Sequence, residues 1–165
     1  MNSLEVSRII LSFEGVNPKE TMKTTDNNIF DLNRFVEAQE HSYASALAEI
    51  RAGRKSLHWV WYIFPQIKGL GQSYNSEYYG IESLDEARAY LQHEVLGARL
   101  CEITKALLEH RGCDAIDVLG CIDAVKVRSS MTLFDVVSPN DIFAEVLDAF
   151  YDGQRCKQTL QKIEK

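Results

Sequence analysis

Residues 56–66, SLHWVWYIFPQ, combine aromatic rings with basic charge in a way that suits ligand binding. They include two tryptophans, a tyrosine, a phenylalanine and a histidine, and the surrounding residues 50–76 contain four lysines or arginines but no aspartate or glutamate. The whole chain carries a net charge of −6, so the positive charge of this window is opposite in sign to that of the chain. Basic groups beside indole rings suit a ligand with an anionic group and a planar ring. The window therefore predicts a pocket for a small anionic or planar molecule.

A second acid-free window, residues 124–134, also carries basic and hydroxyl side chains. On a helical wheel Lys126 shares one flank with Ser129 and Ser130. Arg128 and Thr132 lie on the other flank, because two positions along a helix differ by about 200°. A regular helix cannot direct both basic groups into one pocket, so one should face the ligand while the other is solvated or salt-bridged. The hydroxyl groups could instead bond to the carbonyl four residues earlier.

We expect the pocket to form where these two windows meet. Basic side chains would pair with the anion, the two tryptophans would stack on the planar part, and polar groups would add hydrogen bonds. His58 is the residue to test as a general acid or base. The predicted ligand-binding residues are Arg54, Lys55, Trp59, Trp61, Gln66, Ser73, Lys126, Arg128, Ser129, Ser130 and Thr132.

Each of these features also has a structural interpretation. Clustered aromatic rings are more often core than ligand platform, and a single histidine is more often structural than catalytic. The GLGQS stretch, residues 69–73, could cradle an anion with its backbone N–H groups or form only a turn. The chain shows no Walker A loop, no H-E-x-x-H sequence and no cysteine pair at zinc-binding spacing, so we expect no metal and no cofactor.

Apolar residues recur at helical spacing through most of the chain that follows the first 28 residues. The pattern predicts helices over residues 31–52, 83–93, 96–110, 114–119, 124–137, 141–149 and 158–163. Ser83 should cap the second helix, with Glu86 completing a capping box, and Asp123 should cap the fifth. Residues 57–64 form either a short helix or a strand, and residues 67–80 form a loop over the pocket mouth. We therefore expect a compact all-α domain of seven or eight helices around a central aromatic segment.

Length and composition favour a single globular domain in the cytoplasm. The 165 residues suffice for one helical domain over residues 29–165, with residues 1–28 as an N-terminal arm, mobile or accessory. No apolar run approaches the roughly 20 residues that span a bilayer, so no membrane partner is expected. The four scattered cysteines indicate reduced thiols. The acidic net charge argues against general nucleic-acid binding.

Several long motifs resemble a bacterial family called domain of unknown function 1810 (DUF1810), some members of which carry the label calpastatin-like. They are DLNRFVEAQ, LAEIRAGRKSLHWVWYIFPQIKGLG with Ser73 after it, SLDEARAYL followed by VLGARL, and KVRSSMTLF. The resemblance covers about residues 31–163. It implies a compact, mainly helical fold and leaves the activity open, because the family has no settled function.

Two functions are consistent with these observations. The first is binding, with or without processing, of a small anionic nucleotide-like ligand in the aromatic and basic pocket. The alternative is a non-catalytic adaptor for a protein partner, in which the aromatic segment is core or docking surface. The solvent exposure of the two tryptophans should distinguish these functions.

Overall fold

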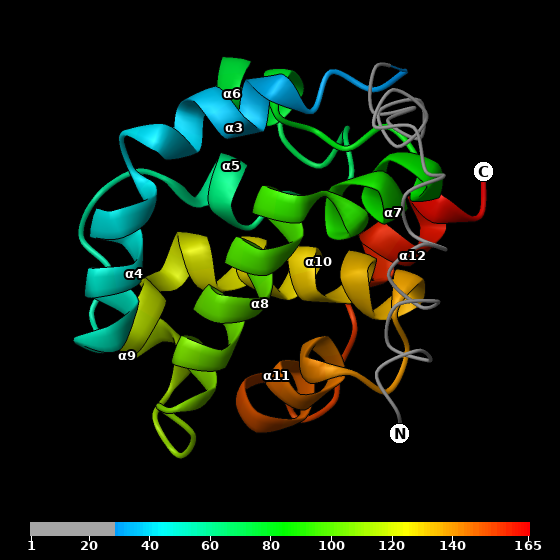
Figure 1. Ribbon diagram of the computed structural model, residues 1–165. Coiled ribbons are helices and arrows are strands. Elements are labelled where there is room, and N and C mark those ends of the chain that lie inside the picture. The colour runs from blue at the N-terminus through cyan, green and yellow to red at the C-terminus, as the bar shows by residue number, and fades with distance from the viewer. Residues whose placement is uncertain (1–28) are drawn as a thin grey trace, which may run out of the picture. The chain divides into compact units, whose positions relative to one another are not determined.

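The computed structural model describes residues 29–165, and its regular elements are helices (Figure 1). The chain divides into residues 1–31 and residues 32–165, and the second unit contains every described helix. Because residues 1–28 lie outside the described residues, the expected division into an arm and a domain stays a prediction. The helices are α3 (Asn33–Glu40), α4 (Tyr43–Arg51), α5 (Val60–Ile63), α6 (Tyr74–Tyr78), α7 (Leu84–Gln92), α8 (Glu94–Leu108), α9 (Ala115–Leu119), α10 (Cys121–Val137), α11 (Ile142–Tyr151) and α12 (Lys157–Ile163).

The all-α class is confirmed: residues 29–165 form ten helices and no strand. The number exceeds the expected seven or eight for two local reasons. The predicted first helix divides into α3 and α4, and the predicted loop over residues 67–80 contains the short α6. No helix among the described residues has the length and apolar character needed to cross a membrane.

Helix α10, yellow in Figure 1, is central to the packing of residues 32–165. It packs against α5, α7, α9, α11 and α12, while α8 packs against α3, α4, α7 and α11. Val127, Met131 and Phe134 are fully buried on one face of α10. Burial of such side chains stabilises the fold by about 1.5–3 kcal/mol each, so this face is fixed inward. The opposite face of α10, with Val125 and Ser129 near its centre, is thereby directed toward a cleft.

The junction between α3 and α4 lies against the aromatic segment. The side-chain amide of Gln39 donates a hydrogen bond to the carbonyl of Tyr62 over 2.7 Å. The Tyr62 hydroxyl donates in turn to Ser42, at the start of α4, over 3.0 Å. Residues 57–64, which the sequence left open between helix and strand, form only the single turn α5 before a proline ends it.

The starts of the seven predicted helices agree with the structure to within two residues except at α10, and His93, predicted to end one helix, also caps the next helix, α8. Ser83 accepts a hydrogen bond from the backbone N–H of Glu86 over 3.1 Å, as a cap should. The Glu86 carboxylate does not complete the predicted capping box, because it accepts from the N–H of Glu82, the residue before the cap, and pairs with Arg34 at 2.7 Å. Asp123 does not cap α10. That helix begins two residues earlier, and the Asp123 carboxylate is paired with lysine instead.

Candidate functional site

The loop over residues 67–80 is closed at its base by two backbone hydrogen bonds. Lys68 donates to the carbonyl of Ile81, and Ile81 donates to the carbonyl of Gln66, each over 2.8 Å. The side chains of Ile67 and Ile81 are buried beneath this bridge. The bridge fixes Gln66 at one end of the loop and α6 within it.

A cleft of about 410 Å³ lies between this loop, α10 and the start of α12. Its polar groups come from Gln66 and Ser76 on the loop side, from Lys126 and Ser129 of α10, and from Cys156. Its apolar lining comes from Leu70, Ile122 and Val125. The cleft therefore offers an ammonium group and several hydrogen-bonding groups beside an apolar wall.

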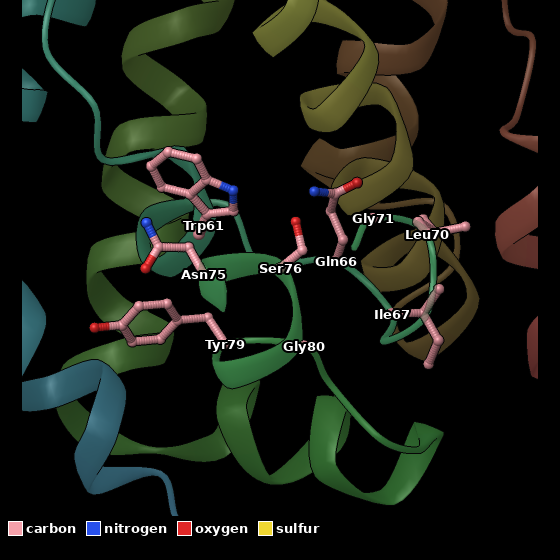
Figure 2. Close-up of a pocket in the computed structure, with 9 residues that line it drawn as sticks. All are labelled: Trp61, Gln66, Ile67, Leu70, Gly71, Asn75, Ser76, Tyr79 and Gly80. Carbon is pink, nitrogen blue, oxygen red and sulfur yellow. The ribbon is translucent and has the colours of Figure 1, made fainter. Parts of the chain in front are cut away.

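A much smaller cavity adjoins the cleft, because Gln66, Leu70, Gly71 and Ser76 line both (Figure 2). It holds about 10 Å³, close to the space of one water molecule. The indole Nε1 of Trp61 is buried in its wall with no hydrogen-bond partner among the described residues. Figure 2 shows this nitrogen on the side of the ring that faces Gln66 and Ser76. Such an unpaired buried donor costs about 1–3 kcal/mol, so the cavity suits an acceptor atom.

Lys126 lines the cleft and lies against the ring of Trp61, which lines the small cavity. Its Nζ lies 4.6 Å from the centroid of the Trp61 ring and 4.0 Å from Oδ1 of Asp123. The second oxygen of Asp123 is paired with Lys55 at 2.6 Å. One carboxylate is therefore shared by two ammonium groups, and Lys126 has the longer contact of the two.

Lys55 is a structural residue. Its side chain is only 3% exposed, and besides pairing with Asp123 it donates to the carbonyl of Leu57. Its Nζ lies 4.5 Å from the centroid of the Trp59 ring. Lys55 therefore does not reach the cleft, in contrast to the role expected for it.

Trp59 belongs to the hydrophobic core. It is 1% exposed, and its Nε1 donates to Glu49 over 2.8 Å. Glu49 also accepts from the backbone N–H groups of Ser56 and Leu57. Burial would raise the pKa of the Glu49 carboxyl, but these hydrogen bonds outweigh it and hold the pKa below its ordinary value. Trp59 cannot stack on a ligand in this arrangement.

Three other predicted residues lie away from the cleft lining. Arg54 and His58 are exposed and line neither cavity. Ser73 caps α6, since its hydroxyl accepts a hydrogen bond from the N–H of Ser76 over 3.2 Å. His58 therefore lies outside both cavities, away from the site where it was expected to act as a general acid or base.

The two flanks of α10 have different partners. Lys126 and Ser129 line the cleft, and Ser130 is buried. Arg128 donates to the carbonyls of residues 154 and 155 over 2.8 and 3.0 Å. The hydroxyl of Thr132 accepts from the backbone N–H of Cys156 over 2.9 Å. The flank that carries Arg128 therefore holds the segment before α12, and the flank that carries Lys126 faces the cleft.

Cys156 is a residue of the cleft that the sequence did not indicate. Its Sγ lies 3.3 Å from the hydroxyl oxygen of Ser129, whose single proton is shared between the sulfur and the carbonyl of Val125 at 3.2 Å. All four cysteines of the chain are free thiols, and Cys121 lines the same cleft. No local sequence pattern predicts this arrangement, because Cys156 and Ser129 are 27 positions apart. Within residues 29–165, no group of three or more His, Cys, Asp or Glu side chains is placed to hold a metal ion.

Comparisons with known proteins agree with the helical architecture. A family model described as "Protein of unknown function (DUF1810)" matches residues 29–163. The chain is similar to the conserved hypothetical protein Rv1873 from Mycobacterium tuberculosis, whose crystal structure is known. The two share 44% identity with a TM-score of 0.80, over 82% of this chain and 98% of that one. A comparison with curated proteins found no match. The family match spans most of the chain, and the protein therefore belongs to the DUF1810 family.

Proposed function

We propose that this domain binds a small anionic, nucleotide-like molecule in the cleft between the loop over residues 67–80 and α10. The observation that carries the proposal is the position of Lys126. Its ammonium group lies beside the ring of Trp61, whose buried indole N–H has no described partner and lines the adjoining small cavity, and Lys126 itself lines the cleft. An anionic group placed there would pair with Lys126 and could accept the Trp61 hydrogen bond.

The charges around Lys126 favour an added anion. Asp123 is the one carboxylate with a described ion pair to Lys126, and its shorter contact is to Lys55. Two ammonium groups against one carboxylate leave a local positive charge. Coulomb attraction at such distances is worth several kilocalories per mole in a partly buried site, at an effective dielectric constant of about 20.

The rest of the cleft suits the other parts of such a ligand. Its volume of about 410 Å³ lies within the range of small-molecule sites, roughly 300–1,000 Å³. The apolar wall of Leu70, Ile122 and Val125 would cover a planar ring, and Gln66 and Ser129 would supply hydrogen bonds. The described lining includes no carboxylate and no histidine, so we propose binding and assign no acid–base step.

We also propose that the domain works in the cytoplasm. The four free thiols support this location, because oxidising compartments favour disulfides.

A thermal-shift screen tests the binding proposal. Nucleotides, ADP-ribose and phosphorylated sugars would be added to the full chain, and a ligand at about 100 times its Kd should stabilise the fold by about 2.7 kcal/mol. Lys126→Met should abolish the shift. Lys105→Met is the matched control, because Lys105 lines a separate cleft of about 420 Å³ beside α8 and α11. A panel without any shift, or a shift that survives Lys126→Met, would rule out this site.

The alternative function is a protein-docking domain, and one observation favours it. Tyr74 and Tyr78 on α6 are exposed, and their rings stack with centroids 5.5 Å apart and planes 9° apart. Exposed tyrosines are frequent anchors of protein interfaces. This alternative would be supported by a defined protein partner that binds the wild-type chain but not a Tyr74→Ala, Tyr78→Ala double variant.

A further inference from the structure

The small cavity beside Trp61 has two hydrogen-bond donors without a described acceptor. The first is the indole Nε1 of Trp61, which is buried and has no partner among residues 29–165. The second is the hydroxyl of Ser76. The Ser73 hydroxyl accepts from the Ser76 N–H over 3.2 Å and donates its single proton to the Ser76 Oγ over 2.9 Å. No described residue accepts the proton of the Ser76 hydroxyl itself, so this proton is available to a ligand.

Gly71 makes room for this hydroxyl. A Cβ atom at Gly71 would lie 2.5 Å from the Oγ of Ser76 and 2.9 Å from its Cβ, so any other residue there would displace Ser76. Figure 2 shows the Ser76 hydroxyl and the Gln66 amide on the side of the Trp61 ring that carries Nε1. All three side chains line the same cavity of about 10 Å³. This space matches a single oxygen atom of a ligand, and the donors around it require that atom to be an acceptor.

The groups around this cavity are better matched by a phosphate monoester than by a carboxylate. The Nζ of Lys126 lies over the face of the Trp61 ring, 4.6 Å from the centroid, whereas the indole N–H lies in the plane of the ring. The Gln66 amide, which lines both the cavity and the cleft, adds a further donor. A carboxylate has two oxygens in one plane, but a phosphate monoester has three strong acceptor oxygens in a tetrahedral arrangement. It can therefore bind the ammonium group, the cavity and the amide together.

The charges of the cleft suit one phosphate group and no more. Lys126 is the one basic side chain in its described lining, and the lining of the small cavity includes none. Lys55 is enclosed with Asp123, and Arg128 donates to two backbone carbonyls. A second phosphate would lie along the apolar wall of the cleft without a cation. A charge that loses water without gaining a partner is unfavourable.

We propose that the ligand ends in a single phosphate monoester. One oxygen enters the small cavity and accepts hydrogen bonds from Trp61 and Ser76. A second oxygen pairs with Lys126, and the third accepts from Gln66. This inference deepens the proposed function and rests on it, because the phosphate lies in the same cleft. It selects nucleoside monophosphates and singly phosphorylated sugars, and it excludes nucleoside diphosphates and ADP-ribose, whose two phosphates are both internal.

Calorimetric titration of the full chain tests this class of ligand. The probes are phenyl phosphate, methyl phenyl phosphate and benzoate, which share a planar ring and differ in the anion. We expect phenyl phosphate to bind about tenfold tighter than the other two, because each of them lacks one acceptor oxygen and therefore one hydrogen bond to a charged group. Among the common nucleotides, the monophosphate that binds most tightly should exceed its own diphosphate by a similar factor. ADP-ribose should not bind measurably.

The indole N–H signals in a nuclear magnetic resonance spectrum report whether the phosphate enters the small cavity. The chain has two tryptophans, so a ¹⁵N-labelled sample gives two such signals, and Trp61→Phe identifies them. Phenyl phosphate should move the Trp61 proton signal downfield, as expected for a new hydrogen bond to an anion. The Trp59 signal should stay in place, because its N–H is already bonded to Glu49.

A substitution at Ser76 tests the second donor. Ser76→Ala should weaken the binding of phenyl phosphate about tenfold, because it removes one hydrogen bond to the anion. Ser45→Ala is the matched control, since Ser45 is exposed on α4 and lines neither cavity. An equal loss in both variants, or no loss in either, would contradict the role of Ser76.

The outcomes separate this inference from the proposed function. If benzoate or a nucleoside diphosphate binds as tightly as the monoester, and Lys126→Met abolishes that binding, the anion site stands and the phosphate monoester is overturned as its ligand. Binding of phenyl phosphate without movement of the Trp61 signal would also leave the anion site in place, but it would exclude the small cavity from it. If no probe binds, the inference and the proposed function both fail.

Discussion

Two lysine–tryptophan pairs lie beside the same carboxylate. They differ in solvent exposure and in the hydrogen bonding of the indole N–H. Lys55 and Lys126 each hold an ammonium group close to an indole centroid, at 4.5 and 4.6 Å respectively, and both contact Asp123. The Lys55 pair is enclosed, whereas the side chain of Lys126 is 23% exposed. The Trp59 indole N–H is bonded to Glu49, and that of Trp61 has no described partner. The same residue types thus build a core contact in one place and a candidate binding site in the other.

The largest difference should appear when each ring is removed. Trp59→Ala should lower the free energy of unfolding by about 3–5 kcal/mol, because it empties a fully buried site. Trp61→Ala should cost about 1–2 kcal/mol, since this ring is only partly buried. Urea unfolding followed by circular dichroism would measure both values. Equal losses would mean that both rings serve the core alike and would end the distinction.

The second largest difference in the free energy of unfolding should appear when each lysine is replaced. Lys55→Met should cost about 2–3 kcal/mol, because it leaves Asp123 with only the longer contact to Lys126. Lys126→Met should cost about 0.5 kcal/mol, as expected for a partly exposed pair at 4.0 Å. The same unfolding measurement applies. A larger loss for Lys126→Met than for Lys55→Met would reverse the assignment of structural and binding roles.

Acid pH should destabilise the protein through Glu49, which accepts a hydrogen bond from the Trp59 indole. The folded-state pKa of Glu49 lies below its unfolded value, so Glu49 stabilises the protein above the unfolded pKa. This contribution is lost as the pH falls through the folded pKa. Unfolding free energies measured across the acid range should therefore fall less steeply for Glu49→Gln than for the wild type. Trp59→Phe should also flatten the curve, because it removes one donor to Glu49, and Trp61→Phe should leave the slope as it is.

The smallest effect concerns the unpaired donor itself. Trp61→Phe deletes a buried N–H without a described partner, so the protein should be unchanged or more stable by up to about 1 kcal/mol. The same substitution should weaken binding of the anionic ligand found by thermal shift. A destabilised Trp61→Phe variant would show that the indole N–H already has a partner, such as bound water.

The sequence predicted what depends on near neighbours. The cap at Ser83 and the helix starts near Asp114 and Asp141 are predicted correctly, because a capping side chain bonds within a few residues of itself. The helical wheel separated Lys126 from Arg128 for the same reason, since their angular spacing is a property of one helix.

The remaining features depend on partners that are distant in sequence. Trp59 and Trp61 lie two positions apart in the same basic window, and only their partners in the fold distinguish them. Glu49 and Asp123 bind Trp59 and Lys55, but in the sequence Glu49 only borders the first window, and Asp123 borders the second and was predicted as a helix cap. Cys156 gives no signal in the sequence for the same reason, because the hydroxyl of Ser129 reaches it only after α12 has packed on α10.

The bridge between Ile67 and Ile81 has a consequence for the thermodynamics of association. Opening the loop would break two backbone hydrogen bonds and expose two buried isoleucines, at about 1.5–3 kcal/mol for each side chain. The wall of the cleft that carries Gln66 and Ser76 is thus preorganised before any ligand arrives. Binding a ligand would therefore cost the protein little conformational entropy at this wall. More of the contact energy would then appear as affinity.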